Sequence, residues 1–371
     1  MNLSFSEEQG MLKKMAGDFL ERECPKSFVR EMAEDEKGYI PELWRKIADL
    51  GWLGLVFPEE YGGGGGSFFD LIILLEEMGR ACFPGPFFST VVLGGLSILT
   101  AGNEEQKREL LPKVGSGDLI LTLALTEPSA SFEEAAISTQ ATIEGENYII
   151  NGTKLFVSDA HVADNIICVA RTRGGITLFL VDAKSPGINC TLLRTLGWDK
   201  QCEVVFNNVK VPRGNILGGE DHGWEVVEKI LEYAAVAKCA EMLGGNETVL
   251  EMSVNYAKER VQFGKPIGSF QAIQHHCANM LVDTDACKYI TYEAAWMISE
   301  GIPATMIASM AKAKVSEASH RVTLLGHQIF GGLGFCMDND IHLYYRRAKT
   351  GALAYGNAAF HQKKVAKELL G

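Results

Sequence analysis

The sequence predicts a multidomain α+β chain with an N-terminal helical domain, a middle antiparallel β-barrel domain and a C-terminal four-helix bundle. Two observations carry this prediction. Residues before about 118 and after about 220 show apolar positions at helical spacing with helix-end signals, whereas the stretch between them holds short β-rich runs that end at turn residues. We therefore expect the domains 1–118, 119–220 and 221–371.

The composition is that of a soluble globular protein. Hydrophobic residues make up 47% and charged residues 22% of the 371 positions, and the mean hydropathy is +0.03, which excludes a disordered chain. Lys and Arg total 35 against 47 Asp and Glu, so a net charge of −12 argues against a nucleic acid partner. Nine scattered cysteines without a Cys-x-x-Cys pair, and no apolar leader, predict reduced thiols in a cytoplasm.

Helix-end signals define the N-terminal domain. Ser6, followed three residues later by Gln9, forms a capping box for a helix that stops near Pro25. Pro41 stands at a first-turn position and opens another helix. These signals predict separate helices joined by short connections.

One uncharged stretch, residues 81–101, has the composition of a membrane segment but not its continuity. Pro84 and Pro86 break any continuous span, because proline removes a backbone donor and clashes with the preceding turn. We expect a buried helix after Pro86 and no membrane insertion.

The middle domain consists of short apolar runs at 119–123, 148–150, 165–170 and 177–181. Asn151-Gly152 sits between two β-rich runs, and Asn-Gly supplies the positive φ angles of a tight hairpin. Turn signals at short intervals without helices between them favour an antiparallel barrel or sandwich over a Rossmann sheet.

The C-terminal domain shows a helical stripe of small and apolar residues. The stripe consists of Ala311, Val315, Ala318, Val322, Leu325 and Ile329. Lys312, Lys314, Glu317 and Arg321 fall mostly off it. Small residues on one face let helices approach closely, as in a bundle.

The segment 256–271 carries the most chemical information. It is expected to form a helix that ends at Gly264, a short turn, and a new helix at Phe270-Gln271. The guanidinium of Arg260 suits a diphosphate, and the amide of Gln271 suits the edge of a heterocycle. From composition alone, an ordinary surface arginine and a core phenylalanine remain the alternative.

With these motifs in one order, the sequence resembles the acyl-CoA dehydrogenase flavoprotein family. The matching motifs are LVFPEEYGG at 55–63, LLP at 110–112, LTEP at 125–128, NGTKLFVS at 151–158, FNNVKVP at 206–212 and QIFGGLG at 328–334. The resemblance runs nearly from end to end, and it implies the three-part helical, β-barrel and helical architecture.

The resemblance also implies bound FAD. The residues implied at the isoalloxazine ring are Leu125, Thr126, Phe156 and Ser158. Those implied at the diphosphate and adenosine are Arg260, Phe263 and Gln271. Those implied to approach the cofactor of a neighbouring subunit are Gln328, Gly331 and Gly332. A cofactor shared between chains implies an obligate oligomer, and the resemblance implies a homo- or hetero-tetramer, built as a dimer of dimers.

The chain departs from the family at the catalytic base, so it resembles a branch that lacks the usual C-terminal glutamate. The family's catalytic glutamate falls at Tyr355, and its alternative base position falls at Ala234, two residues from Glu232. Tyrosine, with an ordinary pKa near ~10, is a poor base. We interpret Tyr355 as lining the pocket and leave the catalytic residue unassigned.

The implied activity is FAD-dependent oxidation of an acyl-CoA thioester to a 2-enoyl-CoA, with electrons passed to an electron-transfer flavoprotein. Two alternatives stay open because the base is missing. The chain could be a base-less partner subunit of a hetero-oligomer, or it could catalyse a different flavin reaction such as desulfination, reduction or oxygenation. The adjacent His275 and His276 point in different directions on a helix, so no metal is expected.

Overall fold

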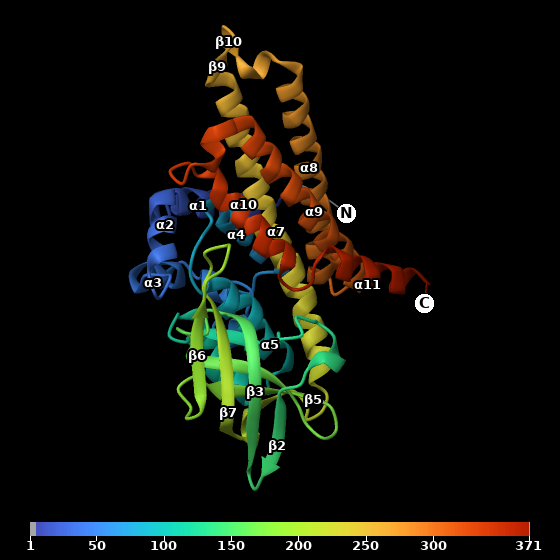
Figure 1. The fold of residues 1–371 in the computed structure, drawn as a ribbon. Coiled ribbons are helices and arrows are strands. Elements are labelled where there is room, and N and C mark those ends of the chain that lie inside the picture. The colour runs from blue at the N-terminus through green and yellow to red at the C-terminus, as the bar shows by residue number, and fades with distance from the viewer. Residues whose placement is uncertain (1–4, 371) are drawn as a thin grey trace. The chain divides into compact units, whose positions relative to one another are not determined.

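The computed structural model describes residues 5–370, whose contacts divide the chain into two compact units (Figure 1). The first unit takes in the chain up to Glu31, Ser67–Phe83 and the chain from Ala235 onward. The second takes in Met32–Gly66 and Pro84–Ala234. The N-terminal helices are therefore distributed over both units, and the domain boundaries near residues 118 and 220 stay a prediction.

The helices before the sheet begin and end where the local signals indicate. They are α1 (Glu7–Glu23), α2 (Lys26–Glu34), α3 (Pro41–Asp49), α4 (Phe68–Ala81), α5 (Leu96–Ala101) and α6 (Glu104–Gly115). Gln9 N donates to Ser6 Oγ at 3.1 Å and the Gln9 side chain accepts from Ser6 N, which confirms the capping box. Pro41 opens α3 as predicted.

The uncharged stretch after α4 is buried. After the turn at Gly85, a π-helix spans Phe88–Gly95 and continues into α5, and every residue of the π-helix is buried. The prediction of a buried helix after Pro86 is confirmed. Within residues 5–370, no helix combines the length and the apolar character needed to cross a membrane.

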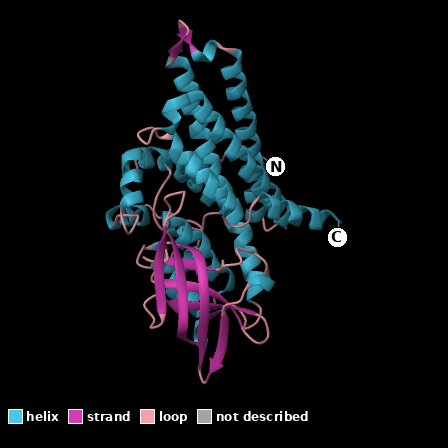
Figure 2. Ribbon diagram, viewed as in Figure 1, coloured by secondary structure: helices cyan, strands magenta, loops and turns pink. Residues whose placement is uncertain are grey.

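The strands of the second unit form one open sheet, drawn in magenta in Figure 2. They are β1 (Leu121–Ala124), β2 (Gln140–Glu144), β3 (Asn147–Ser158), β4 (Asn165–Arg171), β5 (Ile176–Asp182), β6 (Ile188–Leu193), β7 (Gln201–Pro212) and β8 (Ile216–Leu217). The order is β6-β7-β3-β2-β4-β5-β8, with β1 parallel beside β4. The sheet does not close on itself, so the predicted word "barrel" describes it only loosely.

The predicted hairpin at Asn151-Gly152 is wrong. Both residues lie inside β3, and the turn between β2 and β3 falls at Gly145-Glu146 instead. The pairing of β3 with β7 shifts register between Ile150 and Gly152, and a Cβ on Gly152 would lie 2.4 Å from Thr139 Oγ1. Glycine here permits a close approach at a bulge, which competes with its use in turns.

The helices after the sheet are α7 (Gly223–Glu259), α8 (Gln271–Ser299), α9 (Thr305–Phe330), α10 (Ile341–Leu353) and α11 (Ala358–Leu370). The predicted stripe on α9 faces inward, with Ala311, Val315 and Val322 fully buried. Lys312, which the periodicity puts off this stripe, is nevertheless fully buried.

Helix α7 ends five residues earlier than predicted, at Glu259 instead of Gly264. The residues in between form a small antiparallel hairpin of β9 (Val261–Gln262) and β10 (Lys265–Pro266), labelled in Figure 1. Backbone pairing within this hairpin replaces the last expected helical turn, because Ile267 N donates to Arg260 O at 2.8 Å. The next helix begins at Gln271, as predicted.

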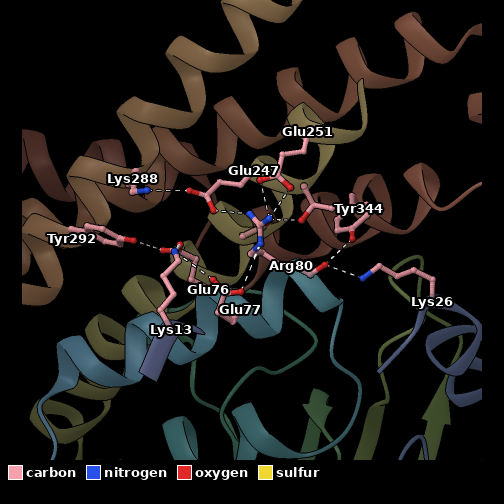
Figure 3. A network of polar contacts seen from close by, with 12 residues as sticks. Lys13, Lys26, Glu76, Glu77, Arg80, Glu247, Glu251, Lys288, Tyr292 and Tyr344 are labelled. Atoms are coloured by element: carbon pink, nitrogen blue, oxygen red, sulfur yellow. Dashed lines mark hydrogen bonds and ion pairs between the residues drawn. The ribbon is translucent and has the colours of Figure 1, made fainter. Parts of the chain in front are cut away.

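A network of ion pairs joins α1, α4, α7 and α8 inside the first unit (Figure 3). Glu76 on α4 is fully buried, pairs with Lys13 and accepts a hydrogen bond from Tyr292 Oη at 2.6 Å. Arg80 binds Glu247 at 2.9 Å. The network borders a cavity of about 870 Å³. Because Lys13 and Arg80 pair with carboxylates from other helices, we infer that the network stabilises the packing of these helices.

Candidate active site

A buried ion pair joins the end of β1 to β3 in the second unit. Lys154 Nζ lies 2.8 Å from Glu127 Oε1 and donates to Leu125 O at 3.2 Å, and the two charged side chains are 0% and 2% exposed. Glu127 also accepts the backbone N–H groups of Ser138 at 2.7 Å and Thr139 at 2.9 Å. Burial acts to raise the pKa of Glu127, but Lys154 and these donors lower it to about 2.

Phe156 projects from a bulge in β3. The pairing with β7 shifts register between Lys154 and Val157, and Phe156 has φ +54°. A left-handed backbone costs a non-glycine residue on the order of 1–3 kcal/mol. The bulge turns the ring outward, so that it is 55% exposed on the second unit.

The four residues implied at the isoalloxazine ring lie together in the second unit. Leu155 N donates to Thr126 O at 2.8 Å, which fixes the segment after β1 against the bulge. Thr122 Oγ1 donates to Ser158 O, which fixes the end of β3 against β1. The structure thus brings Leu125 and Thr126 beside Phe156 and Ser158.

The residues implied at the diphosphate and adenosine lie on the exposed hairpin between α7 and α8. Phe263 forms its tip with φ +52° and is 91% exposed, 6.0 Å from the ring of Phe270. Arg260 and Gln271 flank the hairpin and are exposed. The hairpin therefore presents a guanidinium, an aromatic ring and an amide at the surface of the first unit.

The last implied group lies at the C-terminal end of α9. Gln328 is exposed, and a Cβ added to Gly331 or Gly332 would meet nothing within 4 Å. Gly331 has φ +59° and ψ −135°, a conformation that requires glycine by itself. The Tyr256 ring stacks on Phe330 at 4.3 Å and so joins the end of α9 to the last turns of α7.

Tyr355 lies in the connection between α10 and α11, where the backbone turns left-handed. Tyr355 has φ +56° and Gly356 has φ +99°. His361 Nε2 donates to Tyr355 O at 2.9 Å, and Lys312 Nζ donates to Gly356 O at 2.9 Å. The backbone of this connection is held by two buried side chains.

The alternative base positions lie in the third and fourth turns of α7. Ala234 is fully buried and carries no ionisable group. Glu232 is half-buried and pairs with Lys229 at 2.7 Å. In the part of the chain that the structure describes, no three His, Cys, Asp or Glu side chains are placed to hold a metal ion.

Sequence reasoning missed Lys154 and Glu127 as site residues. Both stand inside motifs that carried the resemblance, but periodicity gives no sign that a lysine in a strand faces the core. The usable signal was a lysine in a strand together with a glutamate beyond a strand end, since a buried charge needs a partner.

Taken separately within each unit, the exposed groups have the chemistry that parts of a flavin dinucleotide require. Phe156 offers an aromatic face, the hairpin offers the guanidinium of Arg260, and Gln328 offers an amide. Open space above Gly331 and Gly332 permits close approach of a ligand to the backbone. The chemistry of these donors suits a ring, a diphosphate and a heterocycle edge.

Three family models match the chain in succession. They are the N-terminal domain of acyl-CoA dehydrogenase at residues 6–118, the middle domain at 122–209 and the C-terminal domain at 221–370. Together these matches cover more than nine-tenths of the 371 residues.

Curated relatives match over nearly their full length. The chain is 31% identical to acryloyl-CoA reductase (NADH) of Anaerotignum propionicum, over 100% of this chain and 96% of the relative. It is 34% identical to 3-(aryl)acrylate reductase of Clostridium sporogenes, over 99% of both chains. It is 32% identical to the caffeyl-CoA reductase-Etf complex subunit CarC of Acetobacterium woodii, again over 99% of both.

Solved structures agree with the fold. Butyryl-CoA dehydrogenase from Megasphaera elsdenii matches with a TM-score of 0.93 at 31% identity over 100% of both chains. A chain of the ChsE4-ChsE5 complex from Mycobacterium tuberculosis matches with a TM-score of 0.92 at 30% identity, over 100% of this chain and 99% of that one. The chain therefore belongs to the acyl-CoA dehydrogenase family of FAD-dependent oxidoreductases, which act on acyl-CoA thioesters.

Proposed function

We propose that this enzyme oxidises an acyl-CoA thioester to a 2-enoyl-CoA and passes the electrons to an electron-transfer flavoprotein. The observation that carries the proposal is the outward-facing Phe156 bulge, tied to the end of β1 by the buried Lys154–Glu127 pair. Such a platform supports a planar ring on hydrogen-bonded strands of the sheet, and a redox site requires groups positioned on such elements.

Ten residues would hold the cofactor through their side chains or their backbone. In this proposal Leu125, Thr126, Phe156 and Ser158 contact the isoalloxazine, Arg260, Phe263 and Gln271 contact the diphosphate and adenosine, and Gln328, Gly331 and Gly332 approach the cofactor of a neighbouring subunit. When bound, FAD supplies the two-electron acceptor for the hydride that leaves the substrate. Exposed Phe263 and the open surface at Gly331 support a tetramer in which chains share cofactors.

The free thiols support a cytoplasmic location as part of the same proposal. All nine cysteines are unpaired in the structure, and Cys24, Cys82 and Cys168 are buried. Cytosolic proteins keep their thiols reduced, whereas secreted proteins usually pair them.

Relatives named as reductases favour a second candidate, the reverse reaction on a 2-enoyl-CoA. In that direction a protonated group must deliver a proton to the α-carbon, and a tyrosine suits the role of acid better than that of base. The ChsE4-ChsE5 complex favours a third reading, a partner subunit of a hetero-oligomer.

Anaerobic mixing with a panel of acyl-CoA thioesters tests the proposal directly. We expect bleaching of the oxidised flavin by at least one saturated thioester. The reductase direction would be established instead if no saturated thioester reduced the oxidised flavin and 2-enoyl-CoAs reoxidised flavin that had been reduced beforehand. If the lone chain showed no flavin reduction and a co-purified homologous chain restored it, the protein would be a partner subunit of a hetero-oligomer.

Replacing Arg260 by alanine is expected to weaken FAD retention by about 10-fold or more, because charge-assisted hydrogen bonds to a diphosphate contribute about 1.5–3 kcal/mol. Lys258, two residues away and exposed, provides the matched control. FAD release during dialysis, followed by absorbance, should be faster in Arg260→Ala than in Lys258→Ala. Equal release in both variants would remove Arg260 from the cofactor site.

Replacing Tyr355 by phenylalanine is expected to leave flavin reduction by substrate nearly unchanged. Phenylalanine keeps the ring volume and removes only the hydroxyl, so a residue that merely lines the pocket should tolerate the change. A positioned proton acceptor would instead cost on the order of 10²-fold. Stopped-flow flavin bleaching compares this variant with Glu232→Gln, which removes the carboxylate two residues from the alternative base position Ala234. Loss of reduction in Tyr355→Phe, with acyl-CoA still bound, would place Tyr355 in the mechanism.

A further inference from the structure

Lys312 is a buried cation, and its hydrogen-bond partners among the described residues are neutral oxygens. Its side chain is 0% exposed. Among residues 5–370, its Nζ donates to Gly356 O at 2.9 Å, Ser316 Oγ at 3.2 Å and Ala352 O at 3.3 Å. A buried ammonium normally pairs with a carboxylate, because its desolvation is costly. Another source of negative charge must therefore support it.

The C-terminal end of α10 supplies that charge. Ala352 stands in the last turn of α10, where backbone carbonyls lack helical partners and carry the negative end of the helix dipole. Burial nevertheless lowers the pKa of Lys312 to about 8. The titratable groups facing it are Cys239 and Lys238 from α7 and His361 from α11.

His361 holds the same connection from α11. Its side chain is 4% exposed, and its Nε2 lies 2.9 Å from Tyr355 O. Since a carbonyl only accepts, the proton is on Nε2. Burial lowers the pKa of His361 to about 4, so the ring is neutral near pH 7. Two side chains therefore fix the carbonyls of Ala352, Tyr355 and Gly356.

We propose that Lys312 is a positioning residue, which together with His361 clamps residues 352–356 and holds Tyr355 in its left-handed conformation at the substrate pocket. The inference rests on the proposed function, which places Tyr355 in the substrate pocket, and it identifies the side chains that hold Tyr355 there. A left-handed tyrosine costs on the order of 1–3 kcal/mol, and it persists only where its surroundings fix it. The hydrogen bonds from Lys312 and His361 provide that fixation.

Hydrogen exchange of the FAD-loaded enzyme tests the clamp itself. In Lys312→Met, we expect amides in residues 352–361 to exchange at least 10-fold faster than in the wild type. Lys363→Met, an exposed lysine of α11, is the control and should match the wild type. Lys312→Gln keeps a neutral NH₂ donor group, so its exchange rate should lie between those of Lys312→Met and the wild type. Methionine removes a buried charge at similar volume, so the variant is expected to fold.

Kinetics separates positioning from a merely structural role. At saturating acyl-CoA, the rate of flavin reduction in Lys312→Met should fall about 10-fold. The acyl-CoA concentration that gives half of the maximal rate should stay unchanged. The wild-type rate should decline as the pH rises through about 8, because the amine loses a proton and one donor, and Lys312→Met should lack this decline.

Wild-type exchange rates at residues 352–361 in Lys312→Met would overturn the clamp, and so would equal acceleration in Lys363→Met. An unchanged rate and pH profile in Lys312→Met would overturn its positioning role. Failure of the proposed function looks different: no thioester would then reduce the wild-type flavin, while the exchange experiment would still decide whether the clamp exists.

Discussion

Replacing Lys154 by methionine is expected to lower the free energy of unfolding of the sheet unit by about 3–5 kcal/mol. Methionine matches the length and packing of the lysine stem, so the lost charge is the main change. Glu127, 2% exposed, would be left as a buried carboxylate without its cation. Urea unfolding followed by circular dichroism measures the loss, and flavin release should shift to lower urea with it.

Lys210→Met provides the control for that experiment. Lys210 lies on the neighbouring strand β7 with an exposed side chain, so its substitution should change stability by no more than about 0.5 kcal/mol. If both variants unfolded at the same urea concentration, the Lys154–Glu127 pair would not be holding the strand end against the bulge.

The same pair predicts a loss of stability in acid. The pKa of Glu127 is about 2 in the folded chain against an ordinary 4.5, so its contribution is present above pH 4.5 and is lost as the pH falls toward 2. The difference corresponds to about 3 kcal/mol. Melting temperatures between pH 5 and 3 should therefore fall more steeply for the wild type than for Lys154→Met.

The helical ends of the chain were predictable because their signals are local. A capping box at Ser6 and a proline at Pro41 each determine a helix start within one turn, and the structure places both starts there. The stripe on α9 was predictable because burial repeats with the helix period. Lys312 escaped the prediction because periodicity describes apolar residues and gives no position for a buried charge.

The middle of the chain was less predictable because its decisive contacts are long-range. Asn151-Gly152 has the composition of a turn, but pairing with β7 keeps both residues inside β3. The parallel neighbour of β1, strand β4, begins more than 40 residues later in the sequence, and no local pattern reveals that pairing. Closure or opening of the sheet depends on such partners.

The candidate site divides in the same way. The motif resemblance predicts which residues touch the cofactor, and that prediction stays untested, although the structure brings Leu125 and Thr126 beside Phe156 and Ser158. The buried lysines stayed unassigned: Lys154, which bonds Leu125 O, and Lys312, which bonds the carbonyls beside Tyr355. Their role depends on which oxygens face them in space, and those oxygens are backbone carbonyls and a distant carboxylate, which no motif specifies.

Replacing Lys13 by methionine is expected to lower the free energy of unfolding of the helical unit by about 3 kcal/mol. Lys13 pairs with Glu76, which is fully buried, and lies 3.4 Å from Glu77 (Figure 3). Without the cation, Glu76 keeps the hydrogen bond from Tyr292 Oη at 2.6 Å but no longer has its charged partner from α1. Urea unfolding of Lys13→Met measures the loss.

Lys14→Met is the matched control, because the neighbouring lysine is exposed and its loss should cost no more than about 0.5 kcal/mol. The pH dependence gives a second check. Burial and Glu247 raise the pKa of Glu76, while Lys13 lowers it, so removing Lys13 raises it further. A carboxyl with a raised pKa contributes less to the stability of the folded state as the pH rises, because the folded state favours its protonated form. The deficit of Lys13→Met relative to the wild type should therefore shrink between pH 8 and pH 5, and a deficit that grew in acid would contradict the role assigned to Glu76.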